Sequence, residues 1–333
     1  MSQQAGDHIL PSDGGISCSC PHPNITPVHT IIKQVLTNHC SLFTLILTNH
    51  SALIILAAQF WCNICDLEDD VMENSFNDDE TEETVLHQAL RSSDTLDMLI
   101  KRLVEIISCC GEHDLDLDQW SPASASVQCL SSLSSCFHSS VSQRLVSFIQ
   151  QNIERGQCWR QEYTAIISIG SLIVGASQHS QKSSSTLLSY ITSFLHLAPN
   201  YLHSANTFLH YAVIFVASRI CDSAPEALSH TLDQFQQTLL LCLHNSKDEK
   251  TVEMCCQTIG SLYNNKDIKR DNDYHYISLL QQLHQLTYSS VVNLQQSSFS
   301  AIMDMVENIS DENTLGRYHC ISRNHFTGLN YVI

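Results

Sequence analysis

The sequence predicts an all-α protein, an α–α superhelix in which helical hairpins stack side by side. Apolar residues make up 43% of the 333 residues, and in most segments they recur three or four positions apart, which is the spacing of one helix face. Only 10 glycines and 7 prolines are present, which disfavours a turn-rich β fold. Every second helical segment also ends in a similar way, which indicates an internal repeat.

The predicted helices follow a polar amino-terminal stretch. Residues 1–27 contain four prolines and no hydrophobic periodicity, so we expect a disordered tail. The C-x-C-x-H spacing of Cys18, Cys20 and His22 has no matching second pair and is a weak metal motif. The predicted helical segments are 28–47, 51–74, 84–110, 121–137, 141–154, 158–176, 183–198, 204–224, 230–245, 248–265, 273–288 and 290–310. Residues 311–333 remain an unassigned tail.

The repeat is measured from one marker residue in each similar segment end. These markers are Ile64, Ser135, Leu172, Ile220, Leu262 and Met305. They lie 71, 37, 48, 42 and 43 residues apart, and four of the five steps fit the period of about 40–47 residues found in HEAT and armadillo repeats. We therefore expect about six helical hairpins over residues 28–310, stacked into a HEAT/armadillo-like solenoid that buries one continuous apolar strip.

Charge and cysteine content narrow the partners and the compartment. The chain has 16 Lys and Arg against 34 Asp and Glu, a net charge of −18, which disfavours direct nucleic-acid binding and favours basic partners. Fifteen cysteines are scattered without a secretory leader in view, so we expect reduced thiols in a cytosolic or nuclear protein. Several fall on apolar helix faces and should be buried as small hydrophobic residues: Cys129, Cys136, Cys221, Cys242 and Cys255.

A membrane span is not expected. The stretch from Leu42 to Cys65 is rich in Leu, Ile and Ala, but polar residues 48–51 divide it into two runs. Each run is too short to cross a bilayer as a helix.

An acidic loop is predicted at residues 111–120. Asp114, Asp116 and Asp118 alternate with leucines and lead to Trp120. The next two residues, Ser-Pro at 121–122, combine a capping hydroxyl with a proline at the first helical position, which is a helix-start signal. An exposed aromatic ring beside carboxylates suits a partner that carries Lys and Arg with their aliphatic stems. The alternatives are a solvated loop, and a Trp120 ring folded onto the next helix as a hydrophobic staple.

Two other tryptophans, Trp61 and Trp159, lie within predicted helices. A large aromatic residue in that position is expected to pack into the core.

Four segments resemble the central portion of the importin β (karyopherin β) family, in the same order along the chain. They are FWCNICDLEDD at 60–70, DLDLDQWSPASASVQCLSSLSSCF at 114–137, FIQQNIERGQCWRQEYTAIISIGSLIVG at 148–175 and SRICDSAPEAL at 218–228. The resemblance runs from about residue 51 to residue 310. Two inner-face tryptophans of the family are replaced here by Phe215 and Gln257. The family's amino- and carboxy-terminal repeats lie outside it, so we expect a truncated relative.

This resemblance implies a nuclear transport receptor. Its family binds the basic segment of importin α or basic cargo inside the superhelix, Ran in its GTP form, and Phe-Gly repeats of nucleoporins. The family's acidic loop and neighbouring tryptophan correspond to Asp114, Asp116, Asp118 and Trp120, which become the candidate partner-binding residues. The resemblance also implies a monomer without cofactors, located in the cytoplasm and nucleus and at the nuclear pore or envelope.

Two other classes of protein are considered. A HEAT-repeat scaffold without transport activity has the same fold, and would differ by failing to bind GTP-loaded Ran and Phe-Gly peptides. An enzyme is not expected, because the chain contains no P-loop, no G-x-S-x-G, no H-E-x-x-H and no paired C-x-x-C ligands.

Overall fold

The computed structural model describes residues 46, 50–75, 95–109, 121–155, 158–178, 180–266, 268 and 275–308. These residues form twelve helices and no strand, so the predicted all-α fold is confirmed. The helices are α3 (Ser51–Ser75), α5 (Thr95–Ser108), α6 (Pro122–Cys136), α7 (His138–Arg155), α8 (Trp159–Gln178), α9 (Ser180–Leu202), α10 (Thr207–Ser223), α11 (Pro225–Leu228), α12 (Leu232–Asn245), α13 (Glu249–Asn264), α14 (Tyr276–Leu286) and α15 (Val292–Glu307). The two predicted tails, and the segment 28–47 apart from Ile46, lie outside the described residues.

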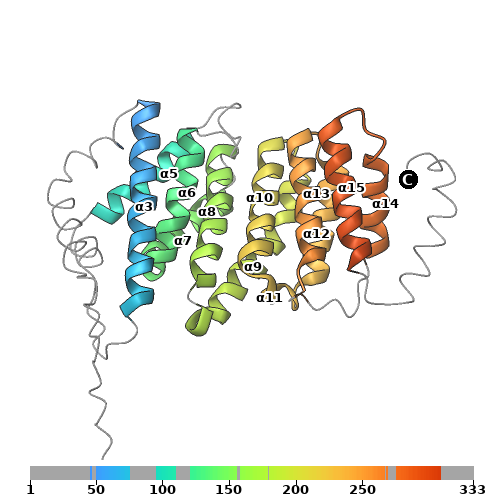
Figure 1. Cartoon of the computed structure of the whole chain (residues 1–333). Helices are drawn as coiled ribbons and strands as arrows, with labels where there is room; N and C mark the ends of the chain where they lie inside the picture. The colour runs from blue at the N-terminus through green and yellow to red at the C-terminus, as the bar shows by residue number, and fades with distance from the viewer. Residues whose placement is uncertain are drawn as a thin grey trace, which may run out of the picture.

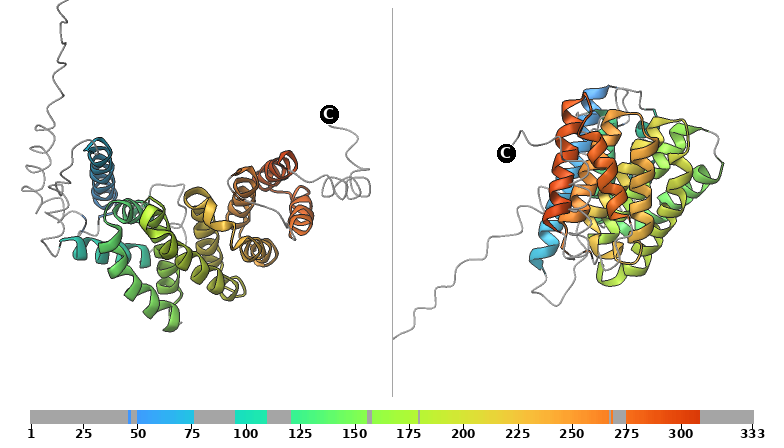
Figure 2. Two further views of the ribbon diagram at one scale, coloured as in Figure 1. Left: turned by 90° about the horizontal axis from the view of Figure 1, so that it is seen from below. Right: turned by 90° about the vertical axis from the view of Figure 1, so that its right-hand side faces the viewer.

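The helices form two rows along an arched array (Figures 1 and 2). One row, which we call the inner row, consists of α3, α6, α8, α10, α13 and α15, packed side by side in that order. The second row packs behind it and consists of α5, α7, α9, α12 and α14. All six sequence markers lie on inner-row helices, so the alternation predicted from the repeat is confirmed. The inner row lines the hollow side of the arch (Figure 2).

The middle of the inner row is buried almost all round. In α8 every residue from Tyr163 to Ile173 is buried, and in α10 the same holds from Leu209 to Ala217. Each helix is covered by two inner-row neighbours and by helices of the second row, which explains its broad apolar pattern. Second-row helices such as α5 instead bury one face, on which Leu96, Leu99 and Leu103 lie.

Two glycines of α8 let its neighbours approach closely. A Cβ atom at Gly175 would lie 2.2 Å from the carbonyl oxygen of Ser134 on α6. A Cβ atom at Gly170 would lie 3.3 Å from a side-chain methyl group of Val216 on α10. The first contact is with backbone and the second with a side chain, so Gly175 is required for the α6–α8 approach and Gly170 is less critical for α8–α10.

Hydroxyl pairs join α8 to its neighbours where apolar contacts would be usual. The Oγ atoms of Ser131 (α6) and Ser171 (α8) are 3.2 Å apart. The Ser108 Oγ atom at the end of α5 lies 3.0 Å from Thr164 Oγ1 on α8. Ser131, Ser108 and Thr164 each also donate to the carbonyl four residues back in their own helix, so these polar groups are satisfied inside the array.

The core contains the predicted cysteines and one predicted tryptophan. Trp61 is 1% exposed, which confirms its expected core role. The five cysteines expected on apolar faces are all buried, and none of them forms a disulfide within the described residues. Burial raises the pKa of the Cys256 thiol, their neighbour, to about 12, so it stays protonated and behaves as a small apolar side chain at neutral pH.

One helix among the described residues has the length and composition of a membrane span. The Ser51–Glu68 part of α3 is 18 residues long with a mean hydropathy of 1.2, so the predicted division at residues 48–51 leaves a longer second run than expected. In the structure 39% of this stretch is buried, and its Ala57, Ala58 and Trp61 pack into the core. The core helix of a soluble protein passes the same test, so this helix is weak support for membrane insertion.

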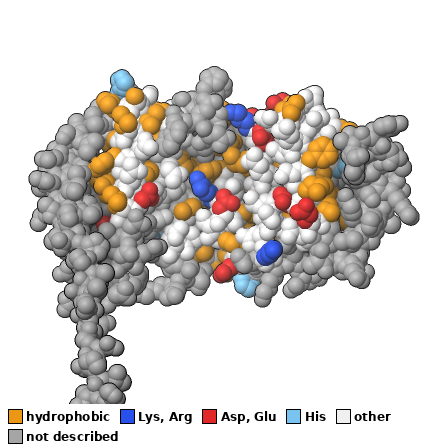
Figure 3. Space-filling model, in the orientation of Figure 1, with side chains coloured by type: hydrophobic (Ala, Val, Ile, Leu, Met, Phe, Trp, Pro, Cys, Tyr) orange, Lys and Arg blue, Asp and Glu red, His pale blue; other side chains and the backbone are white. Residues whose placement is uncertain are grey.

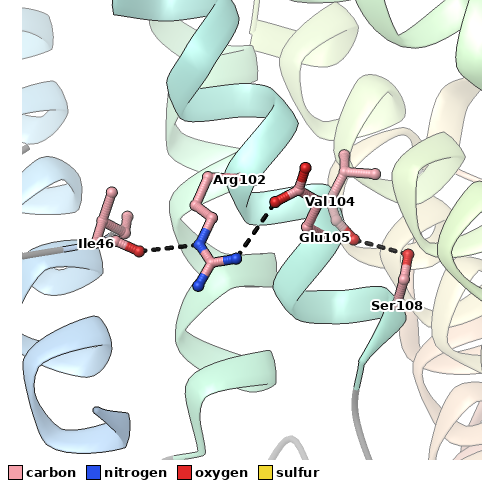
Figure 4. Close-up of polar contacts among 5 residues, drawn as sticks. All are labelled: Ile46, Arg102, Val104, Glu105 and Ser108. Carbon is pink, nitrogen blue, oxygen red and sulfur yellow. Dashed lines mark hydrogen bonds and ion pairs between the residues drawn. The ribbon is translucent and has the colours of Figure 1, made fainter. Parts of the chain in front are cut away.

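Side chains in the middle and at the carboxyl end of helix α5 make hydrogen bonds (Figure 4). The Arg102 side chain donates from Nε to the Ile46 carbonyl oxygen at 3.1 Å, and its Nη1 lies 3.3 Å from Glu105 Oε2. At the carboxyl end, Ser108 Oγ donates to the Val104 carbonyl oxygen at 2.8 Å. The Arg102 bond therefore connects α5 to Ile46, while the Ser108 bond lies within α5 itself.

Candidate functional site

The inner face of the arch presents polar and charged side chains between apolar patches (Figure 3). On three inner-row helices these residues are spaced four and then three or four positions apart, which places them on one side of each helix. They are Gln59, Asn63 and Asp66 on α3, Gln257, Ser261 and Asn264 on α13, and Gln296, Ser300 and Asp304 on α15. Most apolar residues of the same helices are buried, although α3 exposes Leu56 and Leu67 and α15 exposes Val292, Phe299 and Met303.

A first hollow, which we call the Arg219 hollow, has a volume of about 330 Å³. It is lined by Gln59, Cys62 and Asn63 of α3, Ser124, Val127 and Gln128 of α6, and Phe215 and Arg219 of α10. Helix α8 lies between α6 and α10 in the row and contributes no lining residue. Its glycines instead let α6 and α10, its two neighbours in the row, pack close to it.

The only cation of this hollow is held by an aromatic ring. The Arg219 guanidinium carbon lies 5.1 Å from the centre of the Phe215 ring, which is a cation–π distance. Among the described residues it makes no ion pair and no hydrogen bond. The amides of Gln59, Asn63 and Gln128 likewise have no hydrogen-bond partner in the described part of the chain. The hollow therefore presents unused donors over an apolar floor of Val127 and Phe215.

A second hollow, which we call the Asp304 hollow, lies between α13 and α15 and has a volume of about 380 Å³. It is lined by Cys256, Gln257, Gly260, Ser261 and Asn264 of α13 and by Gln296, Ser297, Ser300, Ala301 and Asp304 of α15. A Cβ atom at Gly260 would lie 2.7 Å from Asp304 Oδ2, so the carboxylate rests on the glycine. Partial burial, and then the charge of Glu307, raise the pKa of the Asp304 carboxyl.

An aromatic stack lies at the amino-terminal ends of two inner-row helices. The rings of Trp159 on α8 and Phe208 on α10 are stacked at 4.8 Å with an interplanar angle of 12°. The Arg160 guanidinium carbon lies 4.6 Å from the Trp159 ring. Trp159 packs against the core but is only half-buried, so the predicted core role is confirmed in part.

The sequence-predicted site residues Asp114, Asp116, Asp118 and Trp120 lie outside the described residues. The structure does describe the helices on either side of them in the sequence. These are the second-row helix α5, which ends at Ser108, and the inner-row helix α6, which begins at Pro122.

The predicted helix start at Ser121 is confirmed. The Ser124 backbone N–H donates to Ser121 Oγ at 3.0 Å, and the Ser121 backbone N–H donates to Ser124 Oγ at 2.9 Å. These reciprocal bonds form a capping box, with Pro122 at the first helical position. These bonds fix the start of α6, the inner-row helix that directly follows the predicted site residues.

Sequence reasoning missed both hollows as sites, although it identified one residue of each. Phe215 and Gln257 were assigned to inner-face positions by resemblance, and the structure places them in the Arg219 and Asp304 hollows. The regular spacing of polar residues on inner-row helices was an available signal. Arg219 and Asp304 themselves carried none, because no pattern in the sequence shows which helices face one another.

The described residues contain no group of three or more His, Cys, Asp or Glu side chains that could hold a metal ion. The buried His210 has a structural role. Its Nδ1 lies 2.9 Å from Ser246 Oγ, and its Nε2 lies 2.9 Å from the Ser204 carbonyl oxygen. Both ring nitrogens are thus engaged within the scaffold.

Comparisons with known proteins agree on the fold. No protein-family model matches the sequence, and no curated protein sequence does either. Among solved structures, yeast importin β (Kap95p) superposes with a TM-score of 0.71 and 18% identity, covering 86% of this chain and 33% of its own. The chain has the fold of importin β. A Kap95p structure concerned with RanGDP gives a TM-score of 0.68 at 18% identity, covering 91% of this chain and 37% of its own.

A second karyopherin, Kap121p, gives a TM-score of 0.66 at 12% identity and covers 92% of this chain and 28% of its own. The chain thus spans about a third of the length of these importin-β-fold structures. At these identities the shared property is the solenoid, and the predicted resemblance to the family is confirmed as a likeness of structure.

Proposed function

We propose that this protein is an importin-β-like receptor that binds basic protein segments on its inner face and takes part in protein import into the nucleus. The observation that carries the proposal is an arched importin-β-type solenoid whose inner face holds an unpaired carboxylate. Asp304 makes no ion pair within the described residues and rests in a hollow lined by amides and hydroxyls. A Lys or Arg side chain of a bound segment would supply the missing positive charge.

The acidic loop supports the same partner chemistry. Its residues Asp114, Asp116, Asp118 and Trp120 would contact the basic segment, with the ring packing on aliphatic stems and the carboxylates raising the association rate. A well-packed interface tryptophan contributes about 2–4 kcal/mol, whereas an exposed ion pair contributes about 0–1 kcal/mol. Trp120 is therefore expected to matter more than any single aspartate of the loop.

The solved relatives indicate which proteins to test. They include Kap95p with RanGDP, Kap95 in complex with Nup1, and Kap121p bound to Pho4p. We propose the corresponding classes for this chain: Ran in its GTP form, Phe-Gly nucleoporins, and basic cargo or an importin-α-like basic segment. We also propose a monomeric solenoid over residues 28–310, located in the cytoplasm and nucleus and at the nuclear pore.

A fluorescence titration tests the basic-segment proposal. A labelled helical peptide rich in Lys and Arg is titrated with the full chain at low and high salt, beside a matched peptide in which Glu replaces those residues. We expect binding of the basic peptide that weakens with salt and falls about 30-fold or more for Trp120→Ala. Absence of low-salt binding, or equal binding of the acidic peptide, would contradict the proposal.

A pull-down separates a transport receptor from a HEAT-repeat scaffold. Immobilised GTP-loaded Ran, GDP-loaded Ran and a Phe-Gly repeat peptide are each incubated with the full chain, with a Ser-Gly peptide as the control. Retention by GTP-loaded Ran and by the Phe-Gly peptide supports the receptor. Binding of the basic peptide without either partner favours the scaffold.

A further inference from the structure

The Arg219 hollow has a chemistry that the proposed binding of basic segments does not use. Its guanidinium has five N–H donors, and within the described residues it is held only by the Phe215 ring. The ring fixes the position of the cation and leaves the edge of the guanidinium free. The free edge of a guanidinium held in this way can bind an anion from a partner.

The remaining walls favour a planar anion. Gln59 and Asn63 on α3 and Gln128 on α6 present amides without described partners, and an amide N–H₂ group can donate to a carboxylate oxygen while its carbonyl accepts from a peptide N–H. The floor is apolar, because it consists of the buried hydrophobic side chains of Val127 and Phe215. An aliphatic stem would fit against that floor with its charged end toward Arg219.

The nearest carboxylates of the same helices leave this cation available. Asp222 lies one turn beyond Arg219 on α10, where its Oδ2 accepts from Ser218 Oγ at 3.4 Å. Asp66 lies one turn beyond Asn63 on α3 and is not among the lining residues. Neither forms an ion pair with Arg219, so no carboxylate in the described part of the chain pairs with the positive charge of this hollow.

We propose that the Arg219 hollow binds the carboxylate of an acidic side chain in a polypeptide segment lying on the inner face. Arg219 would pair with the carboxylate oxygens, the three amides would bond to the segment's backbone, and Val127 and Phe215 would contact its aliphatic stem. The site would therefore select, within bound segments, those that place an acidic residue at this point. This inference does not require the binding of basic segments and stands separately from it.

Cys62 provides a reporter inside the hollow. It is a half-buried free thiol among the lining residues. Its pKa is lowered, chiefly by a hydrogen bond from Cys129, although burial and the charge of Asp66 act in the opposite direction. The lowered pKa favours the thiolate, which is the form that takes part in disulfide exchange. In that reaction the thiolate attacks one sulfur of a probe disulfide, the probe S–S bond breaks, and the other half leaves as a thiolate.

The test compares three small disulfides of similar size on the folded full chain: anionic dithiodipropionate, neutral hydroxyethyl disulfide and cationic cystamine. Labelling of Cys62 is followed by peptide mass spectrometry at low salt. We expect dithiodipropionate to react with Cys62 about fivefold or more faster than cystamine, since opposite charges a few ångströms apart attract strongly near a protein surface. Equal rates, or faster cystamine labelling, would overturn the proposal.

Variants of Arg219 test whether this side chain causes the preference for the anionic disulfide. Arg219→Gln should abolish it and Arg219→Lys should retain part of it, while Arg160→Gln, which removes a different exposed cation, should leave it unchanged. Circular dichroism checks that each variant is folded. A preference that survives Arg219→Gln would overturn the assignment.

Protection of Cys62 by peptides distinguishes a carboxylate on an acidic side chain from one at a free carboxyl terminus. Blocked Gly-Ser peptides with a central Glu, a central Gln, or Gln with a free carboxyl terminus are added before labelling. We expect the Glu peptide alone to slow the labelling of Cys62. Protection by the free carboxyl terminus alone, or by none of the peptides, would overturn the assignment to an acidic side chain.

Discussion

The two hollows of the inner face are alike in volume and opposite in charge. The Arg219 hollow measures about 330 Å³ and contains one cation, whereas the Asp304 hollow measures about 380 Å³ and contains one anion. Amides and hydroxyls line both. The comparison teaches that the solenoid supplies the shape of each hollow by helix packing, while a single charged residue decides which partner group it accepts.

The hollows also differ in how they are built. The Asp304 hollow lies between two adjacent inner-row helices, and Gly260 gives its carboxylate a place to rest. The Arg219 hollow is formed by α3, α6 and α10, whose positions depend on the close packing of α6 and α10 against α8. The first should therefore respond to local changes and the second to changes in scaffold packing.

The largest effect is expected from Gly175→Ala. The new methyl group would meet the Ser134 backbone, so α6 must move away from α8, and we expect a loss of about 2 kcal/mol in the free energy of unfolding. Gly170→Ala is the matched control, because its methyl group meets side-chain atoms and the helix itself gains up to about 1 kcal/mol. Urea denaturation measures both. Similar stabilities for the two variants would contradict the packing argument.

Reversing the charge in either hollow should reverse the sign of the charged group that this hollow binds. Asp304→Lys is expected to weaken low-salt binding of a Lys-rich peptide about tenfold, because one attraction is replaced by one repulsion of about 0–1 kcal/mol each. Arg219→Glu should leave that binding unchanged or slightly stronger, while it reverses the disulfide-probe preference at Cys62. Fluorescence titration at two salt concentrations checks both. An equal response to the two variants would show that the hollows do not act separately.

Gly260→Ala should affect the Asp304 hollow alone. Its methyl group would displace the flexible Asp304 carboxylate, so we expect about two- to threefold weaker binding of the Lys-rich peptide with little change in stability. The same change in an Asp304→Asn background is the control, where no further loss is expected. An additive loss there would mean that Gly260 acts through another group.

Acidification should remove the contribution of Asp304 earlier than that of an ordinary aspartate. Its pKa is raised in the folded chain, so the carboxylate required for Lys binding is lost at a higher pH. For stability the sign is opposite: ionisation of this group opposes folding, so its favourable contribution is present at low pH and lost as the pH rises through the raised value. Asp304→Asn should therefore not destabilise the chain at pH 7. Titrations from pH 7 to pH 4, with and without this change, measure the difference.

The smallest effect is expected at the thiol of the Arg219 hollow. Cys129→Ala removes the hydrogen bond that chiefly lowers the pKa of Cys62, so alkylation of Cys62 by iodoacetamide at pH 7 should slow about two- to threefold. Cys129→Ser keeps a donor and should restore most of the rate. Faster alkylation of both variants would indicate opening of the core around Cys129.

Much of the fold could be predicted, because local sequence determines it. The apolar spacing gave most helices, the repeated ends identified the inner row, and Ser121 with Pro122 gave the start of α6. The one-turn helix α11 was missed, since four residues beginning at Pro225 show no periodicity. The segment predicted at 84–110 is described as helix only from Thr95 to Ser108.

The site was less predictable for a physical reason. Asn63, Gln128 and Arg219 come from three helices, and only packing brings them to one hollow. Resemblance placed Phe215 and Gln257 on the inner face, and the structure agrees. The acidic residues Asp114, Asp116 and Asp118 and the ring of Trp120 remain a prediction, which the peptide titration addresses.

The hydroxyl pairs beside α8 have a mechanical consequence. Ser108 and Thr164 each donate to a carbonyl of their own helix, so this α5–α8 pair can separate without leaving a buried donor unmet. Ser171 would instead lose Ser131, the acceptor of its hydroxyl proton. Sliding along such a seam costs less than parting interlocked aliphatic chains. We expect the arch to bend most easily between these helices, so that its curvature can change with the size of the partner bound inside it.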